Sequence, residues 1–159
     1  MSESARILVI DDEEGIRRTV SMTLKRAGYS VDTAENGKQA IEMSEANFYN
    51  LALIDIRLPD MEGTELLTAM KETTPRMIKI ILTGYPALEN AVRAINKRVD
   101  GYLIKPVNTD ELLRFIKENL DKQKHESEYT QQRLTQYVET RVKELQTEEL
   151  DTAKTTKKE

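Results

Sequence analysis

The sequence of 159 residues contains no cysteine and no tryptophan, and aromatic side chains make up only 5% of it. Without cysteine the chain can form neither a disulfide framework nor a thiolate metal site, and it offers no thiol nucleophile. It has no apolar run close to the roughly 20 residues that cross a bilayer, and its N-terminus lacks the apolar stretch of a signal peptide. We therefore expect a soluble, cytoplasmic protein that makes no membrane contact.

An excess of positive charge is also missing. The chain carries 24 lysines and arginines against 28 aspartates and glutamates, for a formal net charge of −4. Such a balance creates no overall field that would attract nucleic acid, so we expect this chain to make no direct nucleic-acid contact. At roughly 150 residues per domain, the length allows one hydrophobic core and an appendage.

Five short apolar runs divide the first 120 residues. They are continuous rather than alternating, which is typical of strands buried on both faces of a parallel sheet. Between them lie segments with the apolar spacing of helices. The pattern predicts an α/β protein with a doubly wound, five-stranded parallel sheet in the order 2-1-3-4-5. The expected strands are Ile7–Ile10, Tyr29–Ala34, Leu51–Ile54, Ile78–Leu82 and Gly101–Ile104.

The expected helices are centred on residues 16–24, 40–46, 66–70, 88–95 and 112–120. Gly28 suits the position just after the C-terminus of the first helix, because glycine readily adopts a left-handed backbone. Pro75 is expected to end the third helix, since proline cannot continue one. Asp100-Gly101 predicts a turn before the last strand.

The composition changes after Leu120. Residues 121–159 contain neither glycine nor proline and few apolar side chains. Leu134, Val138 and Leu145 can be placed on a coiled-coil seam, but Arg141 interrupts it, so the heptad pattern is weak. We predict one globular domain over residues 1–120 and a polar helical extension over 121–159. The extension is expected to be helical to about Leu145 and disordered near its end.

Charged residues stand at the ends of three predicted strands. Asp11 and Asp12 follow the first strand, Asp55 follows the third, and Lys105 ends the fifth. The ligand crevice of an open α/β sheet lies outside the carboxyl ends of its strands, so the four side chains should converge there. Clustered carboxylates repel one another, and a hard cation such as Mg²⁺ takes oxygen ligands. The sequence thus predicts carboxylates, a metal ion and a lysine for a phosphate group.

These residues also have ordinary structural interpretations. Asp11 with Glu14 three residues later resembles a helix capping box. Asp55 stands before a proline-containing loop at residues 58–60, which is common turn chemistry. Thr83, at the end of the fourth strand, could cap the next helix. Their joint occurrence at neighbouring strand ends favours a functional site over these separate explanations.

Taken in order, the residues Asp11-Asp12, Asp55, Thr83 and Lys105-Pro106 resemble the receiver domain of two-component response regulators. The resemblance covers about residues 6–120 and implies the flavodoxin-like fold of that family. It also implies that Asp55 is the phospho-acceptor and that Thr83 and Lys105 contact the phosphoryl oxygens.

The same resemblance implies a metal site and a switch. Mg²⁺ would be bound by Asp11, Asp12, Asp55 and the backbone carbonyl of Arg57. Tyr102 matches the aromatic switch position of the family, which would act together with Thr83. Its ordinary interpretation is a tyrosine half-buried in an edge strand.

In functional terms, the resemblance implies a phosphorylation-dependent signalling switch that receives its phosphoryl group from a sensor histidine kinase. It would not be an enzyme beyond self-phosphorylation and slow autodephosphorylation. A homodimer is possible through the fourth helix, fifth strand and fifth helix, together with the C-terminal helix.

Two alternatives to this function stay open. The chain could be the receiver fragment of a DNA-binding transcriptional regulator that lacks its output domain. It could also be a Mg²⁺-dependent phosphohydrolase, although such enzymes typically place a second carboxylate where Ile56-Arg57 follow Asp55. His125, the only histidine, is interpreted as an incidental exposed residue of the polar extension.

Overall fold

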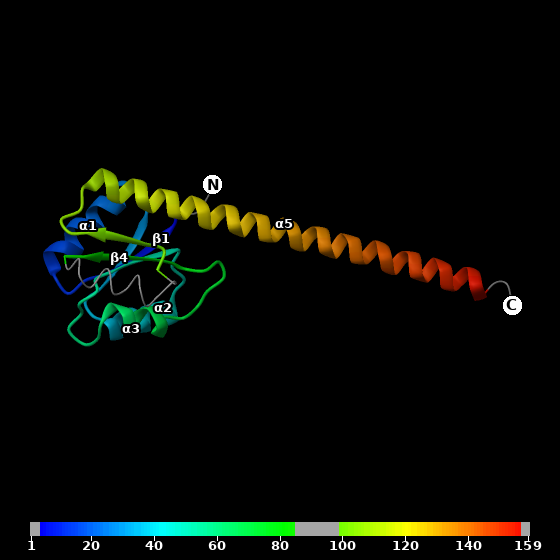
Figure 1. The fold of residues 1–159 in the computed structure, drawn as a ribbon, viewed down its shortest axis with the longest axis horizontal. Coiled ribbons are helices and arrows are strands. Elements are labelled where there is room, and N and C mark those ends of the chain that lie inside the picture. The colour runs from blue at the N-terminus through cyan, green and yellow to red at the C-terminus, as the bar shows by residue number, and fades with distance from the viewer. Residues whose placement is uncertain (1–3, 85–98, 157–159) are drawn as a thin grey trace. The chain divides into compact units, whose positions relative to one another are not determined.

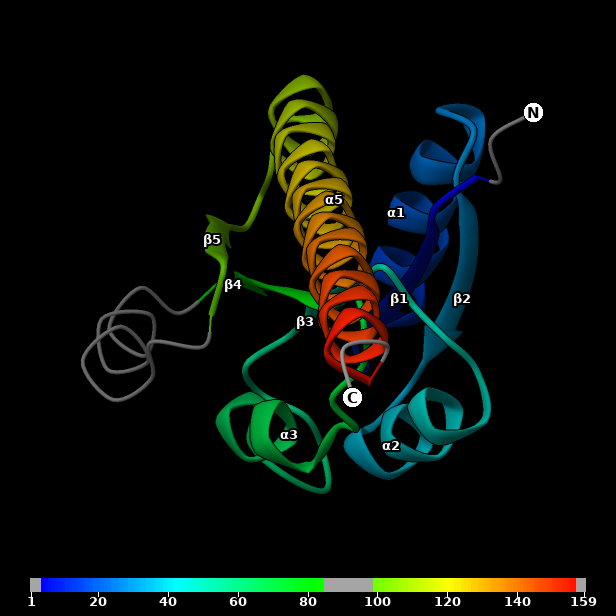
Figure 2. The same cartoon turned by 90° about the vertical axis from the view of Figure 1, so that its right-hand side faces the viewer.

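The sheet of this protein has the predicted architecture. The computed structural model describes residues 4–84 and 99–156. Five strands form one sheet (Figure 1), in the order β2-β1-β3-β4-β5 (Figure 2), and all four neighbouring pairs are parallel. The strands are β1 (Arg6–Ile10), β2 (Ser30–Ala34), β3 (Leu51–Ile54), β4 (Ile78–Thr83) and β5 (Gly101–Ile104).

The described helices follow the predicted apolar spacing. They are α1 (Glu14–Arg26), α2 (Gly37–Ala46), α3 (Gly63–Ala69) and α5 (Thr109–Thr156). The helix expected around residues 88–95 lies outside the described residues. Gly28 follows the C-cap of α1 with a φ of 99°, so its predicted role is confirmed.

The prediction that Pro75 ends the third helix is wrong. Helix α3 ends at Ala69, and Met70 already has an extended backbone with ψ 139°. Met70 is only 3% exposed and belongs to the apolar core beneath the helix. The chain thus leaves the helix at the residue whose side chain is buried in the core, five residues before Pro75.

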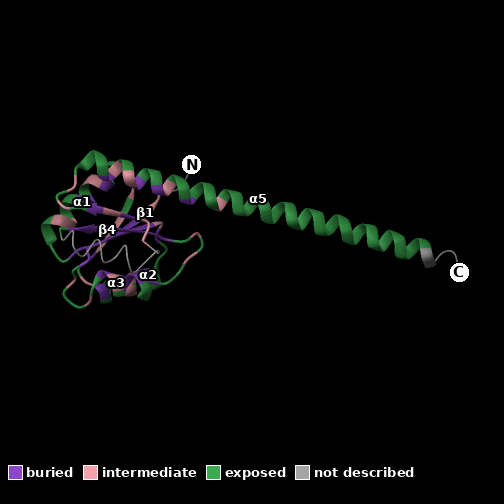
Figure 3. Ribbon diagram, in the orientation of Figure 1, coloured by how far each residue is buried: buried purple, intermediate pink, exposed green. Residues whose placement is uncertain are grey.

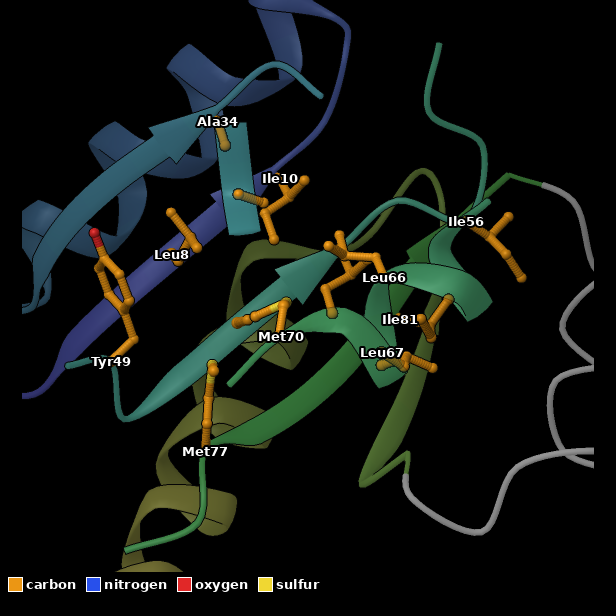
Figure 4. Close-up of a cluster of buried hydrophobic side chains, with 13 residues drawn as sticks. Leu8, Ile10, Ala34, Tyr49, Ile56, Leu66, Leu67, Met70, Met77 and Ile81 are labelled. Atoms are coloured by element: carbon orange, nitrogen blue, oxygen red, sulfur yellow. The ribbon is translucent and has the colours of Figure 1, made fainter. Parts of the chain in front are cut away.

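The two faces of the sheet carry separate apolar cores. One core lies between the sheet and helices α2 and α3, and the other between the sheet and α1 with the first turns of α5 (Figure 2). All residues of β3 and β4 are buried, as continuous apolar runs predict. The first core (Figure 4) contains Leu8, Ile10, Ala34, Ala40, Tyr49, Ala52, Ile54, Ile56, Leu66, Leu67, Met70, Met77 and Ile81.

The chain divides into two compact units, Met1–Gln123 and Lys124–Glu159. Helix α5 extends to Thr156, so the expectation that the helix would end near Leu145 is wrong. Residues 146–156 lack apolar periodicity but contain no glycine or proline, and intrinsic propensity favours a helix for much of this composition.

The second unit is exposed along most of its length. The described side chains from residue 128 to residue 154 are exposed, and His125 is exposed as well (Figure 3). Among the helices of the described part of the chain, none is both long enough and apolar enough to span a membrane.

Candidate functional site

The backbone of the sheet places Asp11 and Asp55 side by side. Asp11 follows β1 and Asp55 follows β3, and Ile10 and Ile54 are partners in the register of these two strands. The Asp55 N–H donates to the Ile10 carbonyl at 2.9 Å, which continues the pairing past the strand ends. Asp11 is 2% exposed and Asp55 6% exposed. Two carboxylates are therefore held together in a nearly dry position.

Lys105 reaches both of these carboxylates from the edge strand. Its Nζ lies 2.7 Å from Oδ2 of Asp11 and 3.4 Å from Oδ2 of Asp55. The Lys105 N–H donates to the Thr83 carbonyl at 2.8 Å, which extends the β4–β5 ladder by one residue. One ammonium group therefore faces two buried carboxylates.

Asp12 completes an acidic cluster. One oxygen from each of Asp11, Asp12 and Asp55 lies within 4.8 Å of the others, and the Asp12 side chain is exposed. The structure thus brings together the four charged residues that the sequence places at strand ends.

The capping-box interpretation of Asp11 is wrong. The N-cap of α1 is Glu13, and the Asp11 carboxylate accepts a hydrogen bond from the Glu13 N–H at 3.0 Å instead. The other oxygen of this carboxylate, Oδ2, accepts a hydrogen bond from Lys105. Both oxygens of Asp11 are therefore engaged in the loop before the helix.

Burial and charge shift the titration of this cluster. Burial raises the pKa of Asp55, and the neighbouring Asp11 charge raises it further, against the opposing effect of Lys105. For Lys105, burial acts to lower the pKa, but the hydrogen bond and charge of Asp11 and the charge of Asp55 raise it overall. The ammonium is firmly charged, whereas Asp55 ionises less readily than an ordinary aspartate. The cluster is short of positive charge.

The loop after β3 packs tightly beneath Asp55. The Arg57 N–H donates to Oδ1 of Asp55 at 3.3 Å, and the Gly63 N–H donates to the Ile56 carbonyl at 2.7 Å. A Cβ atom at Gly63 would lie 2.8 Å from the Asp55 carbonyl oxygen. Glycine is therefore needed where α3 begins. The predicted role of the Arg57 carbonyl as a metal ligand stays a prediction.

Thr83 and Tyr102 lie on the two strands next to the cluster. Thr83 ends β4 and is fully buried. Tyr102 lies on the edge strand β5 opposite Ile81, and it is half-buried against the core under α2 and α3. The helix that Thr83 was interpreted to cap lies outside the described residues.

Sequence reasoning missed the contacts of two residues, Asp60 in the loop after β3 and Arg17 on α1. Asp60 belongs to the loop interpreted as ordinary turn chemistry, but its carboxylate accepts from the Gly37 and Lys38 N–H groups of α2, each at 2.9 Å. These hydrogen bonds lower the pKa of Asp60. The first turn of α2 has no acidic residue of its own, although negative charge stabilises a helix N-terminus. This was the one sign that a carboxylate from elsewhere in the chain would bind there.

Arg17 is the second residue that was missed. Its Nη1 donates to the backbone carbonyl of Asp11 at 2.7 Å. In the sequence it appears only as one of two adjacent arginines on α1, without a sign of which one faces the loop.

The donor set fits a hard divalent cation. The three clustered ligand atoms are carboxylate oxygens, and one of the three residues is open to solvent. Hard cations such as Mg²⁺ take oxygen ligands from one or two carboxylates and keep several waters. A soft metal would prefer sulfur or imidazole, which this cluster does not offer.

Comparison with known proteins agrees with the site. A model of the response regulator receiver domain matches residues 7–117. The regulatory protein AtoC of Escherichia coli (strain K12) is 33% identical over 128 residues, which are 80% of this chain and 28% of AtoC. The cell cycle response regulator CtrA of Brucella ovis is 32% identical over 111 residues, 70% of this chain and 48% of CtrA. The chain spans less than half of either relative.

Solved structures that resemble this chain are also receiver domains of response regulators. A CheY-like response regulator receiver domain protein from Methanospirillum hungatei JF-1 is 45% identical with a TM-score of 0.70, covering 78% of this chain and 99% of that one. The response regulator TrrA of Thermotoga maritima, solved in complex with Mg²⁺-BeF, is 33% identical with a TM-score of 0.65, covering 72% and 98%. The sheet order, the acidic cluster and the family match over residues 7–117 establish that this chain belongs to the response regulator receiver domain family.

Proposed function

We propose that this protein is a phosphorylation-dependent signalling switch in which Asp55 accepts a phosphoryl group from a sensor histidine kinase. The observation that carries the proposal is the approach of the Lys105 ammonium to the buried carboxylates of Asp11 and Asp55, at 2.7 and 3.4 Å. Asp55 shares this lysine with Asp11 and belongs to the same acidic cluster as the exposed Asp12.

Mg²⁺ is the proposed cofactor, held by Asp11, Asp12, Asp55 and the Arg57 carbonyl. When bound, it supplies positive charge that offsets the carboxylates and the oxygens of the incoming phosphoryl group. Support comes from the oxygen-only donor set here and from the Mg²⁺-BeF complex of the related TrrA.

In the transfer step, an Asp55 carboxylate oxygen attacks the phosphorus of the donor. The bond from phosphorus to the donor nitrogen or oxygen breaks, and its electron pair leaves with the donor. The transition state is loose, with charge spread over three oxygens, so the protein mainly positions groups and supplies positive charge. Among the side chains, Lys105 supplies the positive charge, and the Thr83 hydroxyl binds a phosphoryl oxygen.

The switch follows from the burial of Asp55. A phosphoryl group adds about −1.5 to −2 charges and strong acceptors at a position that is 6% exposed. The Thr83 hydroxyl moves toward these acceptors, and Tyr102 turns into the space left beside it. This rearrangement changes the surface around β5, which is the proposed readout face. We propose no enzymatic activity beyond self-phosphorylation and slow autodephosphorylation.

A phosphorylation-strengthened homodimer is the proposed consequence of that change. The C-terminal unit contributes an exposed apolar stripe, with Leu134 62%, Val138 51% and Leu145 45% exposed. A stripe this thin gives weak pairing alone, and a second contact at the readout face adds to it through effective concentration. Sedimentation equilibrium should therefore shift toward dimer when beryllofluoride and Mg²⁺ are added.

The proposed phospho-acceptor is tested by intact-mass measurement after incubation with acetyl phosphate and Mg²⁺. The wild-type protein should gain one phosphoryl mass, whereas Asp55→Asn should gain none. Asp121→Asn, at an exposed position of α5, is the matched control and should label like the wild type. Labelling of Asp55→Asn, or an unlabelled wild type, would contradict the proposal.

A further inference from the structure

Asp12 is exposed, yet the peptide groups on both sides of it are held. Before it, the Asp11 carbonyl accepts a hydrogen bond from Nη1 of Arg17 at 2.7 Å. After it, the Glu13 N–H donates to Oδ1 of Asp11 at 3.0 Å. These two hydrogen bonds constrain the backbone on both sides of Asp12, and so the direction in which its side chain leaves the backbone.

The Arg17 side chain is mostly buried between this loop and the end of β2. Its side chain is only 12% exposed, although arginine usually lies at the surface. Its Nη2 lies 3.7 Å from Oε1 of Glu35, just after β2. The Arg17 side chain therefore contacts both the loop after β1 and the end of the neighbouring strand.

We propose that Arg17 is a positioning residue for the metal site: it fixes the Asp11–Asp12 peptide so that the Asp12 carboxylate stays within reach of Asp11 and Asp55. This inference rests on the proposed function, because it concerns the cation that the acidic cluster would hold. Without the guanidinium, the Asp11 carbonyl loses its partner and the peptide can rotate, which carries Asp12 away from the cluster.

The sign of the effect separates this role from a simple charge effect. Arg17 is a cation near a cation site, so its charge alone opposes metal binding. Removing the charge would then strengthen Mg²⁺ binding, whereas loss of the positioning contact would weaken it. Weaker Mg²⁺ binding after neutralisation of Arg17 therefore cannot come from the direct effect of its charge and supports a positioning role.

The chain supplies a matched control in the next residue. Arg18 lies on the same helix with a side chain that is 71% exposed, and it pairs with Glu14 at 3.1 Å. Arg18→Met removes the same charge from the same helix without touching the Asp11 carbonyl. Arg17→Lys keeps the charge but loses the planar fork that reaches both Asp11 and Glu35.

The experiment is calorimetric titration of the full chain with Mg²⁺, with thermal unfolding in EDTA to verify that each variant is folded. Arg17→Met should bind Mg²⁺ about tenfold more weakly than the wild type, in the range measured when outer-shell partners of metal sites are removed. Arg18→Met should bind no more weakly than the wild type, and Arg17→Lys should show a smaller loss than Arg17→Met.

Wild-type affinity in both Arg17 variants would overturn the inference while leaving the proposed function intact. If Arg17→Met does not fold, the charge-conserving Arg17→Lys decides alone, and wild-type affinity in that variant overturns the inference. A wild type that binds no Mg²⁺ would overturn the proposed metal site and this inference with it.

Discussion

Both ends of the sheet carry charged and polar side chains, but the pairing of charges differs between them. At the amino end, Arg76 makes a two-pronged ion pair with Asp100 at 3.0 and 2.6 Å. Beside it, Nε2 of Gln123 donates to the carbonyls of Asn50 and Arg76 at 3.0 and 2.7 Å. At the carboxyl end, three carboxylates cluster together, and one lysine pairs with two of them.

This difference separates polar groups that stabilise the fold from polar groups that we propose to bind a cation. At the amino end each named charge and amide has a partner of matching kind among the described residues. At the carboxyl end the charges of the described cluster do not balance. Burial raises the pKa of Asp55, and the neighbouring charge of Asp11 raises it further. An excess of buried negative charge is costly unless a cation offsets it, so this end of the sheet is the one prepared for a ligand.

The largest effect should come from removing Lys105, the cation that pairs with both buried carboxylates. Lys105→Met leaves Asp11 and Asp55 without their partner and should lower the free energy of unfolding by about 3 kcal/mol, because breaking a buried pair strands a charge. Urea unfolding in EDTA measures the loss, and the loss should shrink with Mg²⁺. Lys117→Met, at an exposed position of α5, is the control and should change little. A Lys105→Met deficit that Mg²⁺ does not reduce would break the comparison.

A second substitution tests the balanced end. Gln123→Ala removes one amide that satisfies two backbone carbonyls, and it should lower the free energy of unfolding by about 2 kcal/mol. Gln131→Ala, exposed on the same helix, should cost nothing measurable. Because Gln123 lies at the opposite end of the sheet from the cluster, Mg²⁺ affinity should stay at the wild-type value. An altered affinity would show that the two ends are coupled.

Two glycines sharpen the contrast between the loop under the cluster and an open helix surface. A Cβ at Gly63 would lie 2.8 Å from the Asp55 carbonyl oxygen and 2.9 Å from Cα of Ile56, both backbone atoms. Gly63→Ala should therefore destabilise the protein by about 1–2 kcal/mol and reduce labelling by acetyl phosphate. At Gly15 nothing lies within 4 Å, so Gly15→Ala should be neutral or stabilising. Equal effects in thermal unfolding would contradict the close packing.

The smallest effect concerns pH. Since the pKa of Asp55 is raised in the folded protein, folding binds a proton there, and stability falls as pH rises from the ordinary aspartate pKa through the raised value. Asp55→Asn removes this term, so in EDTA the variant should be more stable than the wild type at pH 7 and less dependent on pH below it. Chemical denaturation between pH 4 and pH 7 measures both slopes, and parallel slopes would argue against the raised pKa.

The sequence predicted the framework of the protein because that framework depends on local apolar pattern. Strands Leu51–Ile54 and Gly101–Ile104 lie where continuous apolar runs place them. The convergence of Asp11, Asp55 and Lys105 followed from one rule about strand ends. The end of α3 could not be predicted in this way. The helix stops before Met70, which is buried in a tertiary core, and not at Pro75.

The supporting contacts of the site could not be predicted in the same way. Asp60 and Arg17 act on backbone groups that are 23 and 6 residues away, respectively, and nothing in residue type or spacing identifies such partners. The extent of α5 was missed for a different reason. Its last part has no apolar pattern, so only the intrinsic helix propensity of its residues indicated a helix.

The central claim is that the carboxyl end of the sheet is short of positive charge and binds Mg²⁺. The most direct test is the melting temperature of the wild-type protein as MgCl₂ is added, with NaCl at matched ionic strength to remove general screening. We predict a melting temperature that rises with Mg²⁺ and a response that is largely lost in Asp12→Asn, which keeps the fold but removes one charge of the cluster. A wild type whose melting temperature does not respond to Mg²⁺ would contradict the account.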